Sequence, residues 1–161
     1  MRSLLRAVPL LLLSLVAQAA DVDRRIAVTI DDLPWARLDE IVPPDLQVRH
    51  EALMAQLQQA GVPVVGFVNG NKLEVDGVVQ PARVQMLRDW LDAGYELGNH
   101  TWSLMDLNAK GVAAFQQDFL RGEEVLKPLL AERGHVPRWM RHPYLRAGRT
   151  PQDRPVMDTF F

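Results

Sequence analysis

Short apolar runs alternate with longer amphipathic segments along most of this chain. The runs at residues 25–30 and 62–68 are rich in β-branched residues, which is typical of strands buried on both faces. Apolar positions recur at helical spacing in residues 45–60 and again in residues 114–133. The same alternation predicts three shorter elements: a helix that Pro81 opens and Gly94 ends, a strand from Tyr95 to Leu97, and a strand from Arg138 to Met140.

This order of elements places the chain in the α/β class. Strands that alternate with helices predict a parallel sheet with helical crossovers, either open or closed into a barrel. A complete (β/α) barrel typically needs about 250 residues, and this chain has 161. After Tyr144 the sequence runs through Gly148, Pro151 and Pro155 to Phe161 without another convincing unit. The chain can therefore supply only part of a barrel.

The first residues have the pattern of a secretory signal peptide. Arg2 and Arg6 precede an apolar stretch over residues 7–16, and small residues follow at Ala17 and Ala19. We predict a signal peptide over residues 1–19 that is cleaved after Ala19. A retained membrane anchor is the alternative, although the stretch is shorter than the roughly 20 residues of a spanning helix. Residues 20–161 are then one exported domain, periplasmic or extracellular, without a stable membrane span after cleavage.

The composition limits the kinds of binding partner and metal ligand that this domain can have. The chain is 48% hydrophobic and 24% charged, which matches a soluble globular protein. Loss of Arg2 and Arg6 with the signal peptide moves the net charge from −2 to −4. There is no lysine or arginine stripe, so we expect no nucleic acid partner. There is also no cysteine, so a metal would have to be held by histidine and carboxylate groups.

Three polar clusters each follow a predicted strand: Asp31-Asp32, residues 98–101 and residues 141–144. Taken singly, each has a structural interpretation, as an acidic pair that caps a loop, a hydrogen-bonded histidine and a surface arginine. The carboxyl ends of parallel strands are where α/β proteins assemble their chemistry, and all three clusters fall there. As an ordered set they predict the first half of a metal-dependent active site.

The three clusters also carry a family resemblance. Thr29–Pro34, Gly98–Ser103 and Arg141–Tyr144 resemble successive motifs of the polysaccharide deacetylases, carbohydrate esterase family four. The resemblance covers roughly residues 25–148. It implies a partial, distorted (β/α) barrel with parallel strands, truncated here after about four βα units. It also implies a divalent metal, zinc in particular, that serves hydrolysis of N- or O-acetyl groups on a polysaccharide.

The resemblance assigns roles residue by residue. Asp31 would be the general base, while Asp32 and His100 would be metal ligands. Arg141 would orient Asp31 and keep it charged, and the backbone N–H of Tyr144 would help to stabilise the oxyanion. General chemistry supports the division of the acidic pair, because a carboxylate on a metal is a poor base and its neighbour can take a proton from bound water.

Two departures from the family pattern bear on activity. The family has a second histidine four residues after the first, and this chain has Leu104 there. Leucine has no donor atom, so the inferred ligand set falls to Asp32 and His100, below the three protein ligands usual for catalytic zinc. Asp106 and His142 are the candidates for a substitute ligand. The family's later motifs, including a distal histidine that acts as general acid, have no counterpart after Tyr144.

Three functions remain open on these grounds. The first is an exported metal-dependent deacetylase whose substrate is an acetylated carbohydrate. The second is a noncatalytic deacetylase-like chain that retains at most carbohydrate binding. The third is an unrelated enzyme that uses Asp31-Asp32 with Mg²⁺ for phosphoryl transfer, which the absence of a Gly-rich phosphate loop disfavours.

Several other residues are placed by pattern alone. We expect His50 on a polar helix face and His135 in a turn to be solvated, and His142 to serve packing or hydrogen bonding rather than metal binding. For Trp35 and for Trp102, a place in the core and stacking against a sugar are equally good interpretations. An incomplete parallel sheet exposes edge hydrogen-bonding groups, so we also expect association through that sheet.

Overall fold

A three-stranded parallel sheet forms the centre of the chain in the computed structural model, which describes residues 25–41 and 43–160. The strands are β1 (Val28–Leu33), β2 (Val64–Val68) and β5 (Glu96–Asn99), and β2 lies between the other two. Strands β1 and β2 contain the apolar, β-branched runs predicted for strands covered on both faces, whereas β5 has the sequence Glu-Leu-Gly-Asn. The predicted signal peptide over residues 1–19 lies outside the described residues.

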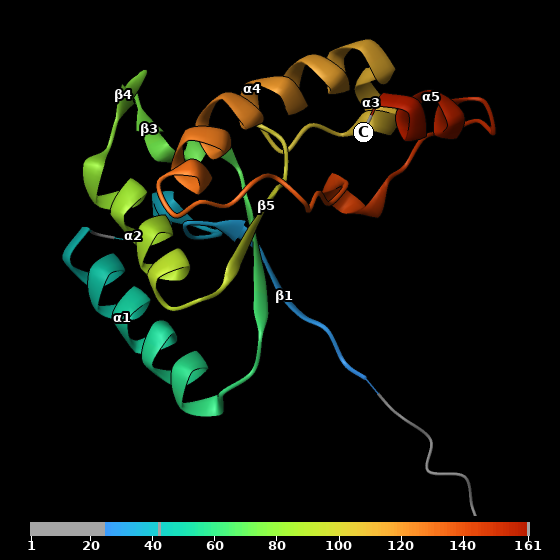
Figure 1. The fold of residues 1–161 in the computed structure, drawn as a ribbon. Helices are drawn as coiled ribbons and strands as arrows, with labels where there is room; N and C mark the ends of the chain where they lie inside the picture. The colour runs from blue at the N-terminus through green and yellow to red at the C-terminus, as the bar shows by residue number, and fades with distance from the viewer. Residues whose placement is uncertain (1–24, 42, 161) are drawn as a thin grey trace, which may run out of the picture.

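Three long helices cover the sheet (Figure 1). Helix α1 (Pro43–Ala60) follows β1, α2 (Pro81–Asp92) follows β2, and α4 (Val112–Ala131) follows β5 after a short helix. In Figure 1, α1 and α2 lie side by side, and α4 packs against β5. The starts and ends agree with the sequence pattern to within a few residues, and α4 continues through Pro128.

The main core lies where these helices meet the sheet. Trp90 and Leu87 of α2 are fully buried, and the face of α4 that holds Leu126, Leu129 and Leu130 packs into the same cluster. Two ion pairs also join α2 to the end of α4. Arg88 Nε lies 2.7 Å from a Glu132 oxygen, and Arg133 Nε lies 2.6 Å from an Asp92 oxygen. Both pairs fasten the two helices on the outside of the core.

The prediction of a fourth strand at residues 138–140 is wrong. Residues 138–140 make only one parallel bridge, between Asn99 and Met140, so the described part of the chain has three strands in its parallel sheet. The barrel is therefore not closed, and the fold is an open α/β sheet rather than four βα units. The pattern at 138–140 correctly places this segment beside β5, but backbone pairing ends after a single residue.

A β-hairpin between β2 and α2 was not predicted. Strands β3 (Glu74–Val75) and β4 (Val78–Val79) pair in an antiparallel manner. The two residues between them, Asp76 and Gly77, have φ values of 50° and 76°. An Asp-Gly pair with both residues at positive φ is the preferred two-residue hairpin turn, so the sequence carried a usable signal.

The segment after Tyr144 also differs from the sequence expectation. It forms a 3₁₀ turn, Pro143–Leu145, and then helix α5 (Asp153–Phe160), where no further unit was predicted. The Asp153 carboxylate accepts hydrogen bonds from the backbone N–H groups of Arg149 and Thr150, which lower the pKa of that carboxyl. Pro155 lies in the first turn of α5, where a missing N–H has little cost.

Helix α5 belongs to a second, smaller core cluster. Its Met157 is buried with Phe115 of α4 and with Leu107 of the short helix α3 (Leu107–Lys110). A further 3₁₀ helix, Leu38–Glu40, precedes α1, and another, Gly70–Leu73, follows β2. Among residues 25–41 and 43–160, no helix has both the length and the apolar character needed to cross a membrane.

Gly98 of β5 allows the segment around Trp139 to lie against the sheet. A Cβ atom added at Gly98 would lie 2.7 Å from the Phe67 ring and 2.9 Å from Trp139 Cβ, closer than packed carbon atoms approach. Neighbouring backbone hydrogen bonds join Asn99 N to Trp139 O (2.8 Å) and Arg141 N to Asn99 O (3.0 Å). The absence of a side chain at this position is therefore what permits the close contact.

We expect Gly98→Ala to destabilise the fold by about 1–3 kcal/mol, because the added methyl group overpacks a site between the Phe67 ring and Trp139 Cβ. Urea unfolding followed by circular dichroism measures this change. A loss below about 0.5 kcal/mol, the range of ordinary surface substitutions, would contradict the packing described here.

Candidate active site

The three polar clusters meet at the carboxyl end of the sheet. Strand pairing aligns Leu33 with Val68 and Val68 with Asn99, and the single bridge aligns Asn99 with Met140. Asp31 and Asp32 lie inside β1, at a break in its register between Ile30 and Leu33, rather than after the strand as predicted. His100 follows β5 directly, and Arg141 follows the bridge. The structure thus brings together Asp31, Asp32, His100 and Arg141.

Arg141 connects two of the clusters through its side chain. Its Nη1 donates to Asp31 Oδ1 at 2.8 Å and to Thr29 Oγ1 at 2.9 Å, both on β1. The guanidinium also lies over the Phe67 ring, 4.5 Å from its centroid. A charge-assisted hydrogen bond of this length fixes the direction of the carboxylate. The pairing of Arg141 with Asp31 predicted from the sequence is therefore present.

His100 is held by the backbone of the same arginine. His100 Nδ1 lies 2.9 Å from the backbone oxygen of Arg141, and the imidazole is only 3% exposed. Because a carbonyl oxygen can only accept, Nδ1 carries the hydrogen, which leaves Nε2 as the ring nitrogen that can offer a lone pair. Nε2 lies 4.0 Å from Asp31 Oδ2. This orientation is typical of a metal-binding or proton-accepting imidazole.

The turn that carries His100 is built from buried polar groups. The Asn99 side chain accepts from Thr101 N at 2.7 Å and donates to Glu123 Oε1 at 2.8 Å. Thr101 has a φ of 67°, a conformation that a β-branched residue rarely adopts. Gly122 of α4 gives Asn99 room, since a Cβ there would lie 2.7 Å from Asn99 Oδ1. Strain of this kind persists only where the surroundings fix it, and it is common at functional sites.

The expected metal ligands do not form a complete set. Among the described residues, no group of three histidine, cysteine, aspartate or glutamate side chains could hold a metal ion. Leu104 has no donor atom, so Asp32 and His100 remain the only pair that the family pattern provides. Two protein ligands do not fit a catalytic zinc centre, which normally has three. The roles of Asp32 and His100 as metal ligands stay predictions.

Neither proposed substitute ligand supplies the missing donor. Asp106 caps α3 by accepting from Asn108 N at 2.9 Å, and it forms an ion pair with Arg146. The His142 ring stacks on Phe115 with a centroid separation of 5.2 Å, and its partial burial lowers the pKa of the imidazole below 6.5. Both side chains therefore have structural contacts of their own. The stacking agrees with the packing role expected for His142.

Tyr144 lies in the turn that follows Arg141. Its φ is 57°, its side chain is exposed, and the neighbouring Leu145 N donates to His142 O at 3.0 Å. The suggested contact of its backbone N–H with an oxyanion stays a prediction.

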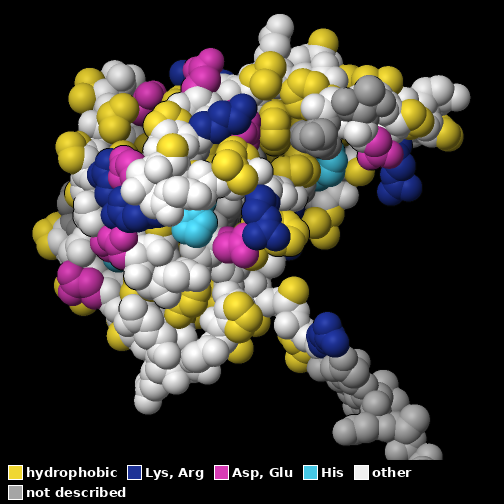
Figure 2. Space-filling model, in the orientation of Figure 1, with side chains coloured by type: hydrophobic (Ala, Val, Ile, Leu, Met, Phe, Trp, Pro, Cys, Tyr) yellow, Lys and Arg dark blue, Asp and Glu magenta, His cyan; other side chains and the backbone are white. Residues whose placement is uncertain are grey.

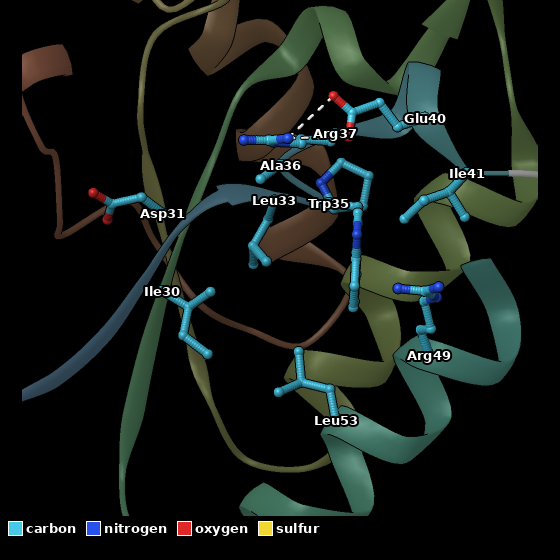
Figure 3. Close-up of a pocket in the computed structure, with 11 residues that line it drawn as sticks. Ile30, Asp31, Leu33, Trp35, Ala36, Arg37, Glu40, Ile41, Arg49 and Leu53 are labelled. Atoms are coloured by element: carbon cyan, nitrogen blue, oxygen red, sulfur yellow. Dashed lines mark hydrogen bonds and ion pairs between the residues drawn. The ribbon is translucent and has the colours of Figure 1, made fainter. Parts of the chain in front are cut away.

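The two tryptophans of the motifs differ in exposure. Trp102 is buried, packs against Gly70 and has the Arg121 guanidinium 3.9 Å from its ring centroid. Trp35 is half-buried and lines a cavity of about 560 Å³ next to β1. Figure 3 shows Trp35, Leu33 and Leu53 around this cavity and Asp31 pointing away from it. Of the two, only Trp35 has a ring face that a sugar could reach.

The prediction for one histidine is wrong, and two residues near the site were not predicted from the sequence. His50 is buried rather than solvated, with Nε2 2.9 Å from Asp89 Oδ2, whereas His135 is exposed as expected. Asn69 and Lys72 follow β2 at the same edge as the clusters. Asn69 Nδ2 donates to His100 O at 2.7 Å, and Lys72 Nζ lies 3.4 Å from Asp32 Oδ1. The rule that located the other clusters, polar residues after a strand, also applies to them.

The surface around the site carries charges of both signs. Figure 2 shows basic and acidic side chains interspersed on the face of the molecule in view.

Comparison with known proteins identifies the family. The sequence profile described as "Polysaccharide deacetylase" matches residues 18–154. The chain belongs to the polysaccharide deacetylase family. This membership confirms the resemblance carried by the three motifs, and it removes the phosphoryl-transfer alternative.

Individual relatives of this family member differ in activity. A chitin deacetylase from Pestalotiopsis sp is 31% identical over 130 residues, which cover 80% of this chain and 37% of the relative. A family 4 acetyl xylan esterase from Clostridium thermocellum, solved with a cobalt ion, matches with a TM-score of 0.54 and 19% identity over 80% of this chain and 53% of its own. The chain thus spans about a third to a half of these relatives.

A pseudoenzyme has the same fold. The wild-type family 4 pseudoenzyme from Bacillus anthracis matches with a TM-score of 0.59 and 13% identity, over 83% of this chain and 40% of its own. A mutant of a pseudoenzyme with restored enzymatic activity matches with a TM-score of 0.57 and 16% identity, over 83% and 41%. The fold is therefore shared by members with and without activity.

The lowered pKa of His142 predicts a pH dependence of stability. Burial lowers this pKa and the nearby Asp158 charge partly opposes the effect, so the folded chain binds fewer protons here than the unfolded chain. The stabilising contribution is complete above pH 6.5 and is lost as the pH falls through the folded-state pKa. In urea unfolding, the fall in stability between pH 7.5 and 5 should be smaller for His142→Gln than for wild type. His135→Gln, at an exposed histidine, should behave as wild type, and an equal slope in all three proteins would contradict this account.

Proposed function

We propose that this chain is an exported member of the polysaccharide deacetylase family that binds an acetylated carbohydrate and, as it stands, lacks metal-dependent hydrolysis. The observation that carries the proposal is the ligand set, because Leu104 leaves Asp32 and His100 without a third donor among the described residues. Family membership supports the acetylated carbohydrate as ligand, and the arginines before the N-terminal apolar run support export. The existence of pseudoenzymes with this fold agrees with the proposal.

The geometry of the remaining site supports carbohydrate binding without catalysis. Asp31 is oriented by Arg141 and can accept a hydrogen bond from a sugar hydroxyl or amide group. His100 Nε2 offers a second acceptor within 4.0 Å of the same carboxylate. Trp35 presents an apolar surface in the neighbouring cavity next to β1, which suits the face of a pyranose ring, although the Asp31 side chain points away from this cavity. None of these contacts needs a metal ion.

An active deacetylase is the second candidate, because the Asp31–Arg141 pair and the orientation of His100 are those that a general base needs. Two assays on one preparation of the full chain distinguish the two candidate functions. Binding of an N-acetyl-chito-oligosaccharide is measured by calorimetry, and acetate release is measured with and without added zinc. Binding without release supports the proposal. Zinc-dependent acetate release by the wild-type chain would overturn it in favour of the second candidate.

The loss of the ligand at position 104 can be tested by restoring it. Leu104→His should raise zinc affinity at least about tenfold in a calorimetric titration, because a third donor completes the usual set. Asp32→Asn added to this variant should abolish the gain. If zinc binds equally well to wild type and Leu104→His, position 104 is not at the ligand site.

The role of Trp35 predicts a selective effect on carbohydrate affinity. Trp35→Ala should weaken oligosaccharide binding about threefold to tenfold through the loss of ring stacking. Trp139→Ala is the matched control, since Trp139 is also partly exposed but does not line the cavity beside Asp31. An equal loss in both variants would show that Trp35 has no specific part in binding.

A further inference from the structure

Lys72 reaches the carboxylate that the family pattern assigns to the metal. Its Nζ lies 3.4 Å from Asp32 Oδ1 and donates to the backbone oxygens of Asp32 (3.3 Å) and Ala36 (3.2 Å). The lysine side chain is 18% exposed and the Asp32 side chain 30%. The ammonium group is thus surrounded by oxygen atoms of β1 and the loop that follows it.

The backbone around Lys72 is fixed by several contacts. Asn71 N donates to Trp102 O at 2.9 Å, and Arg83 Nη1 donates to Lys72 O at 2.9 Å. Gly70 lies so close to the Trp102 ring that an added Cβ would be 2.4 Å from it. A side chain that starts from a fixed backbone loses less conformational entropy when it orders. The approach of Lys72 to Asp32 is therefore built into the turn after β2.

The arrangement places a positive charge beside a carboxylate oxygen of Asp32 that has no hydrogen bond within the described part of the chain. Asp32 Oδ1 is buried and has no hydrogen-bond partner among the described residues. A buried carboxylate oxygen without a hydrogen bond requires a nearby positive charge to offset its desolvation. Lys72 Nζ is the cation that the structure places there.

We propose that the Lys72 ammonium is the resident counter-charge of Asp32 and takes the electrostatic place of a metal ion in this chain. The inference rests on the proposed function, in which Asp32 belongs to an incomplete ligand set. Lys72 is a positioning residue here: it holds Asp32 in its strained backbone conformation, with a φ of 68°. A positive charge beside the ligand oxygen also lowers the affinity of that oxygen for a dication. The site is then stable without metal and resists metal binding.

The test compares Lys72→Met with Lys127→Met, each alone and together with Leu104→His, in the full chain. Lys127 is a matched control, because its Nζ also lies 3.5 Å from a carboxylate oxygen of a buried acidic residue, Glu123, and this ion pair involves neither Asp31 nor Asp32. Zinc is the probe, and the readouts are calorimetric zinc affinity and the thermal unfolding midpoint with zinc or with EDTA.

We expect Lys72→Met to lower the unfolding midpoint by about 3–8 °C, because the buried oxygen of a partly exposed carboxylate loses its charged partner. With Leu104→His present, Lys72→Met should tighten zinc binding at least about tenfold more, and zinc should then recover the lost midpoint. Lys127→Met should leave zinc affinity unchanged. The proposal is overturned if Leu104→His binds zinc equally well with and without Lys72.

Asp32→Asn provides a second test, and if Lys72→Met alone does not fold, the double variant with Asp32→Asn should still fold. If the ammonium serves the carboxylate, removing the charge of Asp32 together with Lys72 should restore part of the stability lost in Lys72→Met alone. A double variant less stable than both single variants would contradict the pairing. Acetate release by wild type with zinc tests the proposed function separately, so its failure is distinguishable from failure of the Lys72 pairing.

Discussion

The pairing of Asn99 with the segment Trp139–Arg141 is the interaction on which the rest of the site depends. Two backbone hydrogen bonds, of 2.8 and 3.0 Å, join Asn99 to residues on either side of Met140. They bring Arg141 next to the sheet, where its side chain binds Asp31 and its carbonyl oxygen binds His100. Arg141 therefore contacts two clusters that lie 110 and 41 residues before it in the sequence, and Gly98 provides the space for its segment beside the sheet.

An open sheet is sufficient to assemble this part of the site. The residues come from β1, from the turn after β5, and from the segment bridged to β5. Strands β1 and β5 both pair with β2, and the segment joins the outer side of β5. The buried Asn69 adds a hydrogen bond from the turn after β2 to His100 O. The geometry of Asp31, His100 and Arg141 thus follows from local strand order, and closure of a barrel is not needed to produce it.

The alternation of apolar runs was enough to predict the parallel sheet, the three long helices and the meeting of the polar clusters. The prediction from this alternation failed at two segments, where the backbone pairing and the helix start do not follow the hydrophobic pattern. Residues 138–140 look like a strand but pair through one residue, and α5 begins after glycine and proline residues that normally end helices. The Asp76-Gly77 turn was a readable signal for the hairpin. Lys72 could be placed beside a strand end, but its approach to Asp32 depends on the turn after β2, which periodicity does not describe.

If Lys72 is the counter-charge of Asp32, as proposed, the type of cation at this site decides which properties the chain keeps. An ammonium group can offset a buried carboxylate and hold the end of β1 in place, as a metal ion can. It has no vacant coordination position, however, and cannot act as a Lewis acid on a carbonyl group or on water. A chain in which Lys72 serves Asp32 keeps the shape and the hydrogen-bond acceptors of a deacetylase site. It can therefore retain recognition of an acetylated sugar while the step that requires a metal is lost.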